Sequence, residues 1–321
     1  MAELVPAIGD YLAQILQDTY PLWNDGLARE RYDRFWEAQL RTPWGSAHLD
    51  RVALVEGGAV ISSAKRYDLS ARIEGRIRRV LGIGAVFTPP ARRGRGAAQQ
   101  LLETLLDTAE AEGFEYAMLF SEIDPAFYER LDFVPIPVLE SRLEVRMKGG
   151  SPAVLIRAGD DRDIPSVAEM SAKRLEGARF ALDRTEDWIR YGIAKRRLLA
   201  GLGPPGLRDV EFLVTEEGHQ AVAYIVSTVQ GGRWFIDDAG DRDPSGARLG
   251  AMLQAMIART PHLPAPEIRA WLPHNFTPPQ VTRVEMQAIP EVMMIRPLKD
   301  RALPLPPLDG SQVTYCRLDY F

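Results

Sequence analysis

The chain has 321 residues, a length that suggests two domains more readily than one. Hydrophobic residues make up 46% and charged residues 26%, which is ordinary for a globular protein and excludes extensive disorder. The formal net charge of -5, from 39 lysines and arginines against 44 acidic residues, argues against nonspecific nucleic-acid binding but leaves room for a local basic pocket.

Hydrophobic spacing predicts a mixed α/β segment in the first half of the chain. The clearest element is a helix from Gly96 to Glu112, because its leucines recur every three or four residues and form one apolar stripe. The predicted elements are, in chain order, helices at Ile8–Leu16 and Arg29–Leu40, strands at Val52–Val55, Ala59–Tyr67 and Arg76–Phe87, the helix from Gly96, a strand at Tyr116–Phe120, a short helix at Ala126–Leu131 and a strand at Glu140–Arg146.

The second half repeats this order of elements, which indicates an internal duplication; two unrelated α+β domains are the alternative. Its predicted elements are a strand at 154–159, helices at Ile164–Arg174 and Glu186–Leu199, strands at Glu211–Thr215, Ala221–Val229 and Trp234–Asp237, a helix at Leu249–Ala258, and strands at Glu267–Trp271 and Glu291–Arg296. The linkers are predicted at 148–153, KGGSPA, and at 303–310, LPLPPLDG.

The residues that bind metals or form disulfides are scarce. Cys316 is the only cysteine, which excludes an internal disulfide and a thiolate zinc site, and the four histidines have no ligand-like spacing, so no metal is expected. No apolar run approaches the roughly 20 residues that span a bilayer, and the first residues lack the pattern of a secretory signal. We therefore expect a cytoplasmic protein without a membrane or nucleic-acid partner, and the sequence leaves open whether it forms a homo-oligomer.

Residues 80–113 contain the most informative motif, VLGIGAVFTPPARRGRGAAQQLLETLLDTAEAEG. A strand ends at Thr88, two prolines follow, and an arginine- and glycine-rich cluster leads directly into the leucine-striped helix. Glycines allow successive N–H groups to face one point, and the helix N-terminus adds partial positive charge, so the pattern is typical of an anion-binding site. Pro89 and Pro90 cannot donate ladder hydrogen bonds, so we expect the strand to splay there. A solvated arginine-rich turn that only starts a helix is the alternative.

The run Arg93-x-x-Gly96-x-Ala98, between a strand and an amphipathic helix, resembles the acetyl-CoA motif of the GNAT superfamily of N-acetyltransferases. The sequence GAVFTPPARRGRGAA, with SEIDPAFYERLDF downstream, is most similar to the enhanced-intracellular-survival (Eis) acetyltransferases, which acetylate amines of aminoglycosides, polyamines or lysines. The resemblance covers residues 1–147 in sequence and 151–298 only in the order of elements.

This resemblance implies an α/β (α+β mixed) fold of two tandem GNAT-like domains. Each would be a mixed, mostly antiparallel sheet flanked by helices, with a short C-terminal tail. It places a catalytic domain at 1–147, a degenerate second GNAT-like domain at 154–300, and a Pro-rich spacer and tail at 301–321.

The resemblance also implies the cofactor-binding residues, with acetyl-CoA as co-substrate. Backbone groups of Val86, Phe87 and Thr88 would bind the pantetheine arm, and one of their N–H groups would face the thioester oxygen. Ser121 and Glu122 would lie beside the cofactor. The residues expected to hold the pyrophosphate are Arg93, Gly94, Arg95, Gly96, Ala97 and Ala98.

Two catalytic residues follow from the same resemblance. Tyr128 matches the family's proton donor, which would protonate the departing thiolate. The alternative is a core aromatic, although Phe127 and Phe133 fit the buried positions better. In the survival-type enzymes the terminal carboxylate, on a Phe, is the base, and this chain also ends in Phe321. Those enzymes carry a sterol-carrier-like third domain before the terminus, whereas about 20 residues follow the second repeat here, so Glu122 acting through a water remains the competing base.

The second repeat is predicted not to bind the cofactor. When the helix predicted at Leu249–Ala258 is aligned with the helix from Gly96, so that Leu253 matches Leu101, Arg248 falls at the place of Gly96. Asp241 and Asp243 would repel a pyrophosphate.

The expected activity is transfer of an acetyl group to a primary amine of a small molecule or a lysine. A non-catalytic acyl-CoA sensor is the alternative, and succinyl or propionyl donors remain open. Aromatic and acidic residues in the first 45 positions, Trp36 and Trp44 among them, would suit a cationic amine but serve equally well as core.

Overall fold

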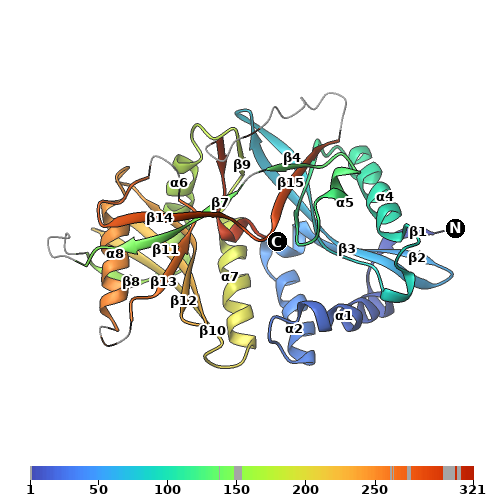
Figure 1. The fold of residues 1–321 in the computed structure, drawn as a ribbon, viewed down its shortest axis with the longest axis horizontal. Coiled ribbons are helices and arrows are strands. Elements are labelled where there is room, and N and C mark those ends of the chain that lie inside the picture. Colours follow the sequence, from blue (N-terminus) through green and yellow to red (C-terminus); the bar gives the residue numbers. More distant parts are fainter. Residues whose placement is uncertain are drawn as a thin grey trace. The chain divides into compact units, whose positions relative to one another are not determined.

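The computed structural model describes residues 2–136, 138–147, 154–260, 262, 264–272, 276–298, 308 and 312–321. The chain divides into two compact units, each built from separate stretches of sequence (Figure 1). The first contains Met1–Pro137, Pro290–Asp309 and Phe321, and the second contains Val138–Ile289 and Gly310–Tyr320. The predicted linker 148–153 and residues 303–307 of the Pro-rich stretch lie outside the described residues.

The first unit is a sheet with helices on both faces. Its elements are β1 (Glu3–Pro6), α1 (Gly9–Trp23), α2 (Arg29–Leu40), α3 (Pro43–His48), β2 (Leu49–Glu56), β3 (Ala59–Ile73), β4 (Arg76–Phe87), α4 (Ala97–Ala111), β5 (Tyr116–Ser121), α5 (Ala126–Glu129), β6 (Val134–Ile136) and β15 (Val292–Pro297). The strand order is β1-β2-β3-β4-β5-β15-β6, and in this order β4 and β5 pair in parallel while the other neighbours are antiparallel.

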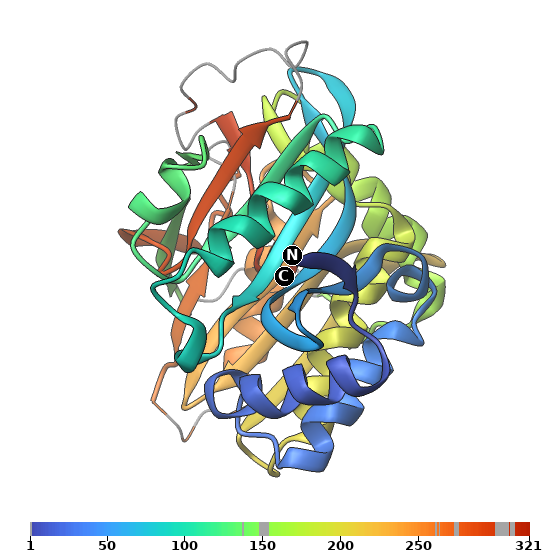
Figure 2. The ribbon, with the colours of Figure 1, turned by 90° about the vertical axis from the view of Figure 1, so that its right-hand side faces the viewer.

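The alternation of side chains along β2 explains why helices cover both faces of this sheet. Val52 and Leu54 pack with the leucines of α4, whereas Ala53 and Val55 pack with Ile15 of α1. Figure 2 shows α4 crossing the sheet, with α1 and α2 on the side away from it. The leucine stripe of α4 is fully buried, as its spacing predicted.

The second unit repeats this plan. Its elements are β7 (Leu139–Val145), β8 (Ile156–Ala158), α6 (Ile164–Arg174), β9 (Phe180–Leu182), α7 (Glu186–Leu202), β10 (Arg208–Glu217), β11 (Gln220–Gln230), β12 (Arg233–Asp241), α8 (Ala247–Ala258), β13 (Glu267–Ala270), β14 (Val281–Ala288) and β16 (Val313–Thr314). The sheet order is β14-β7-β13-β12-β11-β10-β8, with β12 and β13 parallel. In both units a helix, α4 or α8, connects the parallel pair.

The expected fold class is confirmed: two mainly antiparallel sheets are flanked by helices. Two strands differ from the sequence expectation. The strand predicted to close the first segment, β7, pairs with β13 and β14 in the second sheet. The strand predicted to close the second segment, β15, pairs with β5 and β6 in the first sheet. Local alternation reveals a strand but not its partner.

Candidate active site

The N-terminus of α4 is an open anion-binding site. The helix begins after Gly96, whose φ of 78° is left-handed, and Gly94 has a φ of 72°. A Cβ at either glycine would meet no atom within 4 Å, so nothing in the described structure covers this turn. Among the residues that the structure describes, no side chain caps α4. Its first N–H groups therefore remain available to a ligand, with the helix dipole behind them.

Arginines surround this turn. Arg93 and Arg95 are exposed and Arg92 is half-buried. The Nε of Arg93 donates a hydrogen bond of 3.0 Å to the carbonyl of Thr88, which ties the arginine loop to the end of the strand. Within the described ranges, none of the three guanidinium groups forms an ion pair with a carboxylate. The loop therefore offers uncompensated positive charge, which matches a diphosphate.

The parallel strands β4 and β5 separate just before this loop. Their pairing runs from Val80 with Tyr116 to Ile83 with Leu119 and then ends, although β4 continues to Phe87. The splay was predicted, but its cause differs from the expectation. Ala85 has a φ of 47°, and the register of β3 against β4 shifts here, so a bulge bends the strand before either proline is reached.

The three residues expected at the pantetheine lie directly after this bulge. Val86 and Thr88 are half-buried, while Phe87 is buried and contacts Trp23 edge-on at 6.2 Å between ring centroids. The Ser62 hydroxyl donates to the Phe87 carbonyl at 3.0 Å, which holds the strand end against β3. The unpaired edge of β4 beyond Ile83 is the one from which β5 has diverged.

Tyr128 lies in α5 and is 7% exposed, with its ring against Phe127 and Phe133. Burial, followed by the nearby charge of Glu122, raises the pKa of Tyr128 to about 12, so the phenol stays protonated. Its hydroxyl is not among the buried polar atoms of the described residues that lack a hydrogen-bond partner. The expectation that Phe127 and Phe133 fit the buried positions better than Tyr128 was wrong for Phe127: Tyr128 and Phe133 are buried, and Phe127 is half-buried.

Ser121 and Glu122 occupy different environments. The Ser121 hydroxyl is engaged in a turn, since it donates to the Ile123 carbonyl at 2.8 Å and accepts the Ile123 N–H at 3.3 Å. Glu122 is exposed, and its charge acts on Tyr128.

Phe321 lies on the sheet of the first unit. Its ring packs at 4.6 Å from Tyr67 and 5.4 Å from Phe120, between centroids. A Cβ added to Gly82 would be 2.9 Å from the Phe321 ring, and one added to Gly84 would be 3.2 Å from the Phe321 oxygen. The carboxyl group of Phe321 thus lies against β4 one residue before the bulge at Ala85.

Three residues of this arrangement were missed by sequence reasoning. Gly82 and Gly84 leave the space that Phe321 fills, and Tyr67 forms the wall beside them. Burial raises the pKa of Tyr67 above its usual value, so its phenol is a neutral wall. The available signal was the pair of glycines inside a strand, because such glycines often mark the close approach of another group.

The N-terminus of α8 in the second unit is closed. Asp241 Oδ2 accepts the N–H groups of Arg248 at 2.9 Å and Leu249 at 3.0 Å, so the chain's own carboxylate occupies the anion site. A Cβ at the N-cap residue, Gly246, would be 2.6 Å from the ring of Phe276.

The alignment that set Arg248 opposite Gly96 was wrong. Gly246 is the N-cap of α8 as Gly96 is of α4. Asp241 therefore acts by occupying the N–H groups of the helix, not only by repelling a ligand.

The aromatic residues near the first two helices belong largely to the core. Trp36 and Trp44 are buried. The guanidinium of Arg51 lies 5.0 Å and the ammonium of Lys65 lies 5.5 Å from the Trp36 ring, so two of the chain's own cations already use this aromatic surface.

The part of the chain that the structure describes contains no group of three or more residues arranged to hold a metal ion. Within it, no helix is both long and apolar enough to cross a membrane.

A helix N-terminus open to anions beside splayed parallel strands is suited to binding a phosphate group. Residues 13–136 match the family model described as "Acetyltransferase (GNAT) domain", so this part of the chain is similar to GNAT acetyltransferase domains. No curated protein matches the sequence.

Solved structures agree in fold with the whole chain. A GCN5-related N-acetyltransferase from Kribbella flavida is similar with a TM-score of 0.66 and 17% identity, over 92% of this chain and 71% of that one. Eis1 from Mycobacterium abscessus is similar with a TM-score of 0.56 and 14% identity, over 94% and 74%. The N-myristoyltransferase of Saccharomyces cerevisiae, solved with myristoyl-CoA, has a TM-score of 0.54 and 10% identity, over 92% and 78%. The expected resemblance to tandem GNAT proteins of the Eis type is confirmed at the level of the fold.

Proposed function

We propose that this chain is an acetyl-CoA-dependent N-acetyltransferase that moves an acetyl group to a primary amine, on a small molecule or a lysine, through a ternary complex. The observation that carries this proposal is the uncovered N-terminus of α4 beside the bulge at Ala85. The GNAT match over residues 13–136 supports acyl transfer, and the acyl-CoA held by the yeast neighbour supports the choice of donor.

In this proposal the loop before α4 binds the diphosphate. The N–H groups of Gly94, Gly96, Ala97 and Ala98 converge on it, and Arg93 and Arg95 pair with its oxygens. Two left-handed glycines are needed here because a Cβ at those φ values would be strained.

The end of β4 would orient the thioester. Val86, Phe87 and Thr88 bind the pantetheine amides as an added strand would, using the edge that β5 leaves unpaired. One of their N–H groups donates to the thioester oxygen as that oxygen gains negative charge. Such a donor contributes roughly 10²- to 10³-fold to turnover.

Proton transfer completes the reaction. The carboxylate of Phe321 accepts a proton from the acceptor amine, which attacks the thioester carbon, and the C–S bond breaks as the new C–N bond forms. Tyr128 donates its proton to the departing sulfur, so that free CoA leaves as a thiol. The position of the Phe321 oxygen beside Gly84 supports this base, whereas Glu122 acting through a water is the alternative.

We propose that the two units have different roles. The first carries the chemistry, and the second is a degenerate copy whose α8 N-terminus is filled by Asp241. The free thiol of Cys316 fits a reducing compartment such as the cytoplasm.

The test is release of free thiol from acetyl-CoA in the presence of a panel of primary amines. The proposal predicts thiol release that depends on the amine and yields its N-acetyl product. Tight acetyl-CoA binding without thiol release from any amine would instead identify a non-catalytic acyl-CoA sensor.

A further inference from the structure

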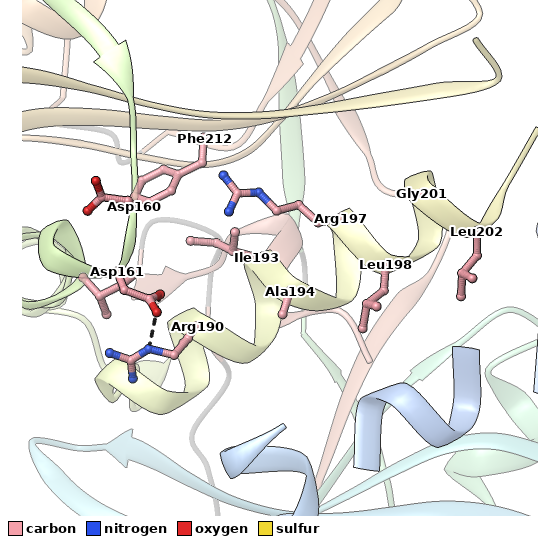
Figure 3. Close-up of a pocket in the computed structure, with 11 residues that line it drawn as sticks. Asp160, Asp161, Arg190, Ile193, Ala194, Arg197, Leu198, Gly201, Leu202 and Phe212 are labelled. Carbon is pink, nitrogen blue, oxygen red and sulfur yellow. Dashed lines mark ion pairs between the residues drawn. The ribbon is translucent and has the colours of Figure 1, made fainter. Parts of the chain in front are cut away.

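A pocket of about 430 Å³ is lined by residues of the second unit, none of which is assigned to the proposed reaction. One face of α7 forms its long wall, with residues spaced three or four apart from Arg190 to Leu202 (Figure 3). The start of the turn before α6, at Asp160 and Asp161, closes one end, and Phe212 of β10 lies at the same end, beside Asp160. Its volume is within the range of pockets that bind small molecules.

The pocket has an apolar floor. Ile164, Ile193 and Leu198 line it together with Phe212, whose ring is buried. Gly159 leaves room for that ring, because a Cβ there would be only 2.6 Å from a Phe212 ring carbon.

Most of the charges around the pocket are already used. Arg190 pairs with Asp187 at 2.8 Å and also faces Asp161 at 3.6 Å. Asp160 accepts the N–H of Arg162 at 3.0 Å and pairs with its guanidinium at 3.3 Å. Glu186 also lies 3.9 Å from Arg190, so the carboxylates at this end are paired within the chain but outnumber the guanidinium groups that pair with them.

Arg197 differs from these groups. Its guanidinium lies 5.8 Å from the centroid of the Phe212 ring, and no carboxylate of the described residues forms an ion pair with it. In Figure 3 it extends alongside Ile193 toward Phe212, over the apolar floor. A guanidinium beside an apolar surface is suited to a carboxylate whose body is apolar.

We propose that this pocket binds an apolar monocarboxylate, with its carboxylate on Arg197 and its aliphatic or aromatic body on Ile193, Leu198 and Phe212. A cavity of about 150 Å³ accommodates benzene, so a volume near 430 Å³ has room for a medium-length chain or more than one ring. This ligand site is independent of the proposed acyl transfer and would persist if that activity were refuted.

The test is calorimetric titration of the full chain with octanoate, with 1-octanol and octylamine as probes of the same chain length. Octanoate should bind with 1:1 stoichiometry, and octylamine should not. Arg197→Gln should weaken octanoate about 10- to 100-fold, the value of a charge-assisted contact, while leaving octanol unchanged. Arg41→Gln, at an exposed arginine of the first unit, is the matched control and should change nothing.

Two further measurements separate this pocket from other sites. Saturating CoA should not displace octanoate, and Ala194→Trp, which fills the pocket from α7, should abolish binding. The proposal is overturned if octanoate fails to bind at millimolar concentration, if Arg197→Gln binds it unchanged, or if CoA competes with it.

Discussion

The N-termini of α4 and α8 have the same backbone arrangement, but the first is open to an anion and the second is capped by the chain's own carboxylate. Each helix follows a left-handed glycine, Gly96 or Gly246, and connects two parallel strands. At α4 the first N–H groups face an uncovered turn surrounded by arginines, whereas at α8 a carboxylate from the preceding strand, Asp241, accepts two of them. The same helix terminus can thus bind a ligand's anion or be capped permanently by the chain's own.

The largest effect, on CoA binding, is expected from placing an acidic side chain at the open N-terminus of α4. Gly96→Asp would bring a carboxylate beside the diphosphate and should weaken CoA binding by about 100-fold or more, because like charges repel strongly at about 4 Å. Gly96→Asn is the matched control, since it has the same backbone strain without the charge. Calorimetry should show a much smaller loss for Asn, and equal losses would assign the effect to strain.

The proton donor comes next in size. Tyr128→Phe should lower turnover roughly 10²-fold, within the range for a general acid, while the affinity for acetyl-CoA stays unchanged. Steady-state kinetics would separate kcat from KM. Unchanged kcat in this variant would remove Tyr128 from the mechanism.

A somewhat smaller loss is expected from moving the carboxylate of Phe321. Adding one glycine after Phe321 should lower kcat about tenfold or more, because the carboxylate would no longer lie beside Gly84. Phe321→Ala keeps the carboxylate and loses the ring contact with Tyr67, so it should retain more activity than the extended chain. Full activity of the extended chain would point to Glu122 as the base.

Removing the carboxylate that caps the N-terminus of α8 should lower the stability only modestly. Asp241→Ala removes the cap from α8 and should lower the free energy of unfolding by about 1 kcal/mol. The number of CoA molecules bound per chain should remain one, because Phe276 still covers Gly246. A second bound CoA would mean that Asp241 alone keeps the second unit from binding.

The smallest effect is expected from raising the pH, because the protonation state of Tyr128 should not change between pH 7 and 10. Burial raises the pKa of Tyr128 to about 12, so its phenol stays protonated throughout pH 7–10. Turnover should rise with pH as the acceptor amine loses its proton, and it should show no decrease at any pH up to 10. Because the folded pKa lies above the usual value of about 10, the stability contributed by the neutral phenol is complete below pH 10 and is lost as pH rises toward 12. A fall in kcat below pH 10 that Tyr128→Phe abolishes would contradict this.

Features that depend on neighbouring residues could be read from the sequence. The leucine stripe placed α4 to within one residue at each end, and the glycine–arginine cluster located its open N-terminus. In α8 the apolar residues recur every few positions, so the helix matches α4 at more than one offset. That ambiguity explains why Arg248 was aligned with Gly96 in place of Gly246.

Features that depend on distant parts of the chain could not be read in this way. Nothing in the sequence of β7 or β15 specifies which sheet each one joins, because the partner strands are distant in the chain. The contact of Phe321 with Gly82 and Gly84 joins residues more than 200 positions apart, and the turn that engages the Ser121 hydroxyl has no sequence pattern of its own.

The most direct test of the account is calorimetric titration of CoA into the unmodified chain and into Gly96→Asp and Asp241→Ala. The account predicts one CoA per chain in the unmodified protein, binding lost with an acid at Gly96, and one CoA retained when Asp241 is removed. Absence of heat from the unmodified chain, or binding that survives Gly96→Asp unchanged, would contradict the assignment of the α4 terminus as the cofactor site.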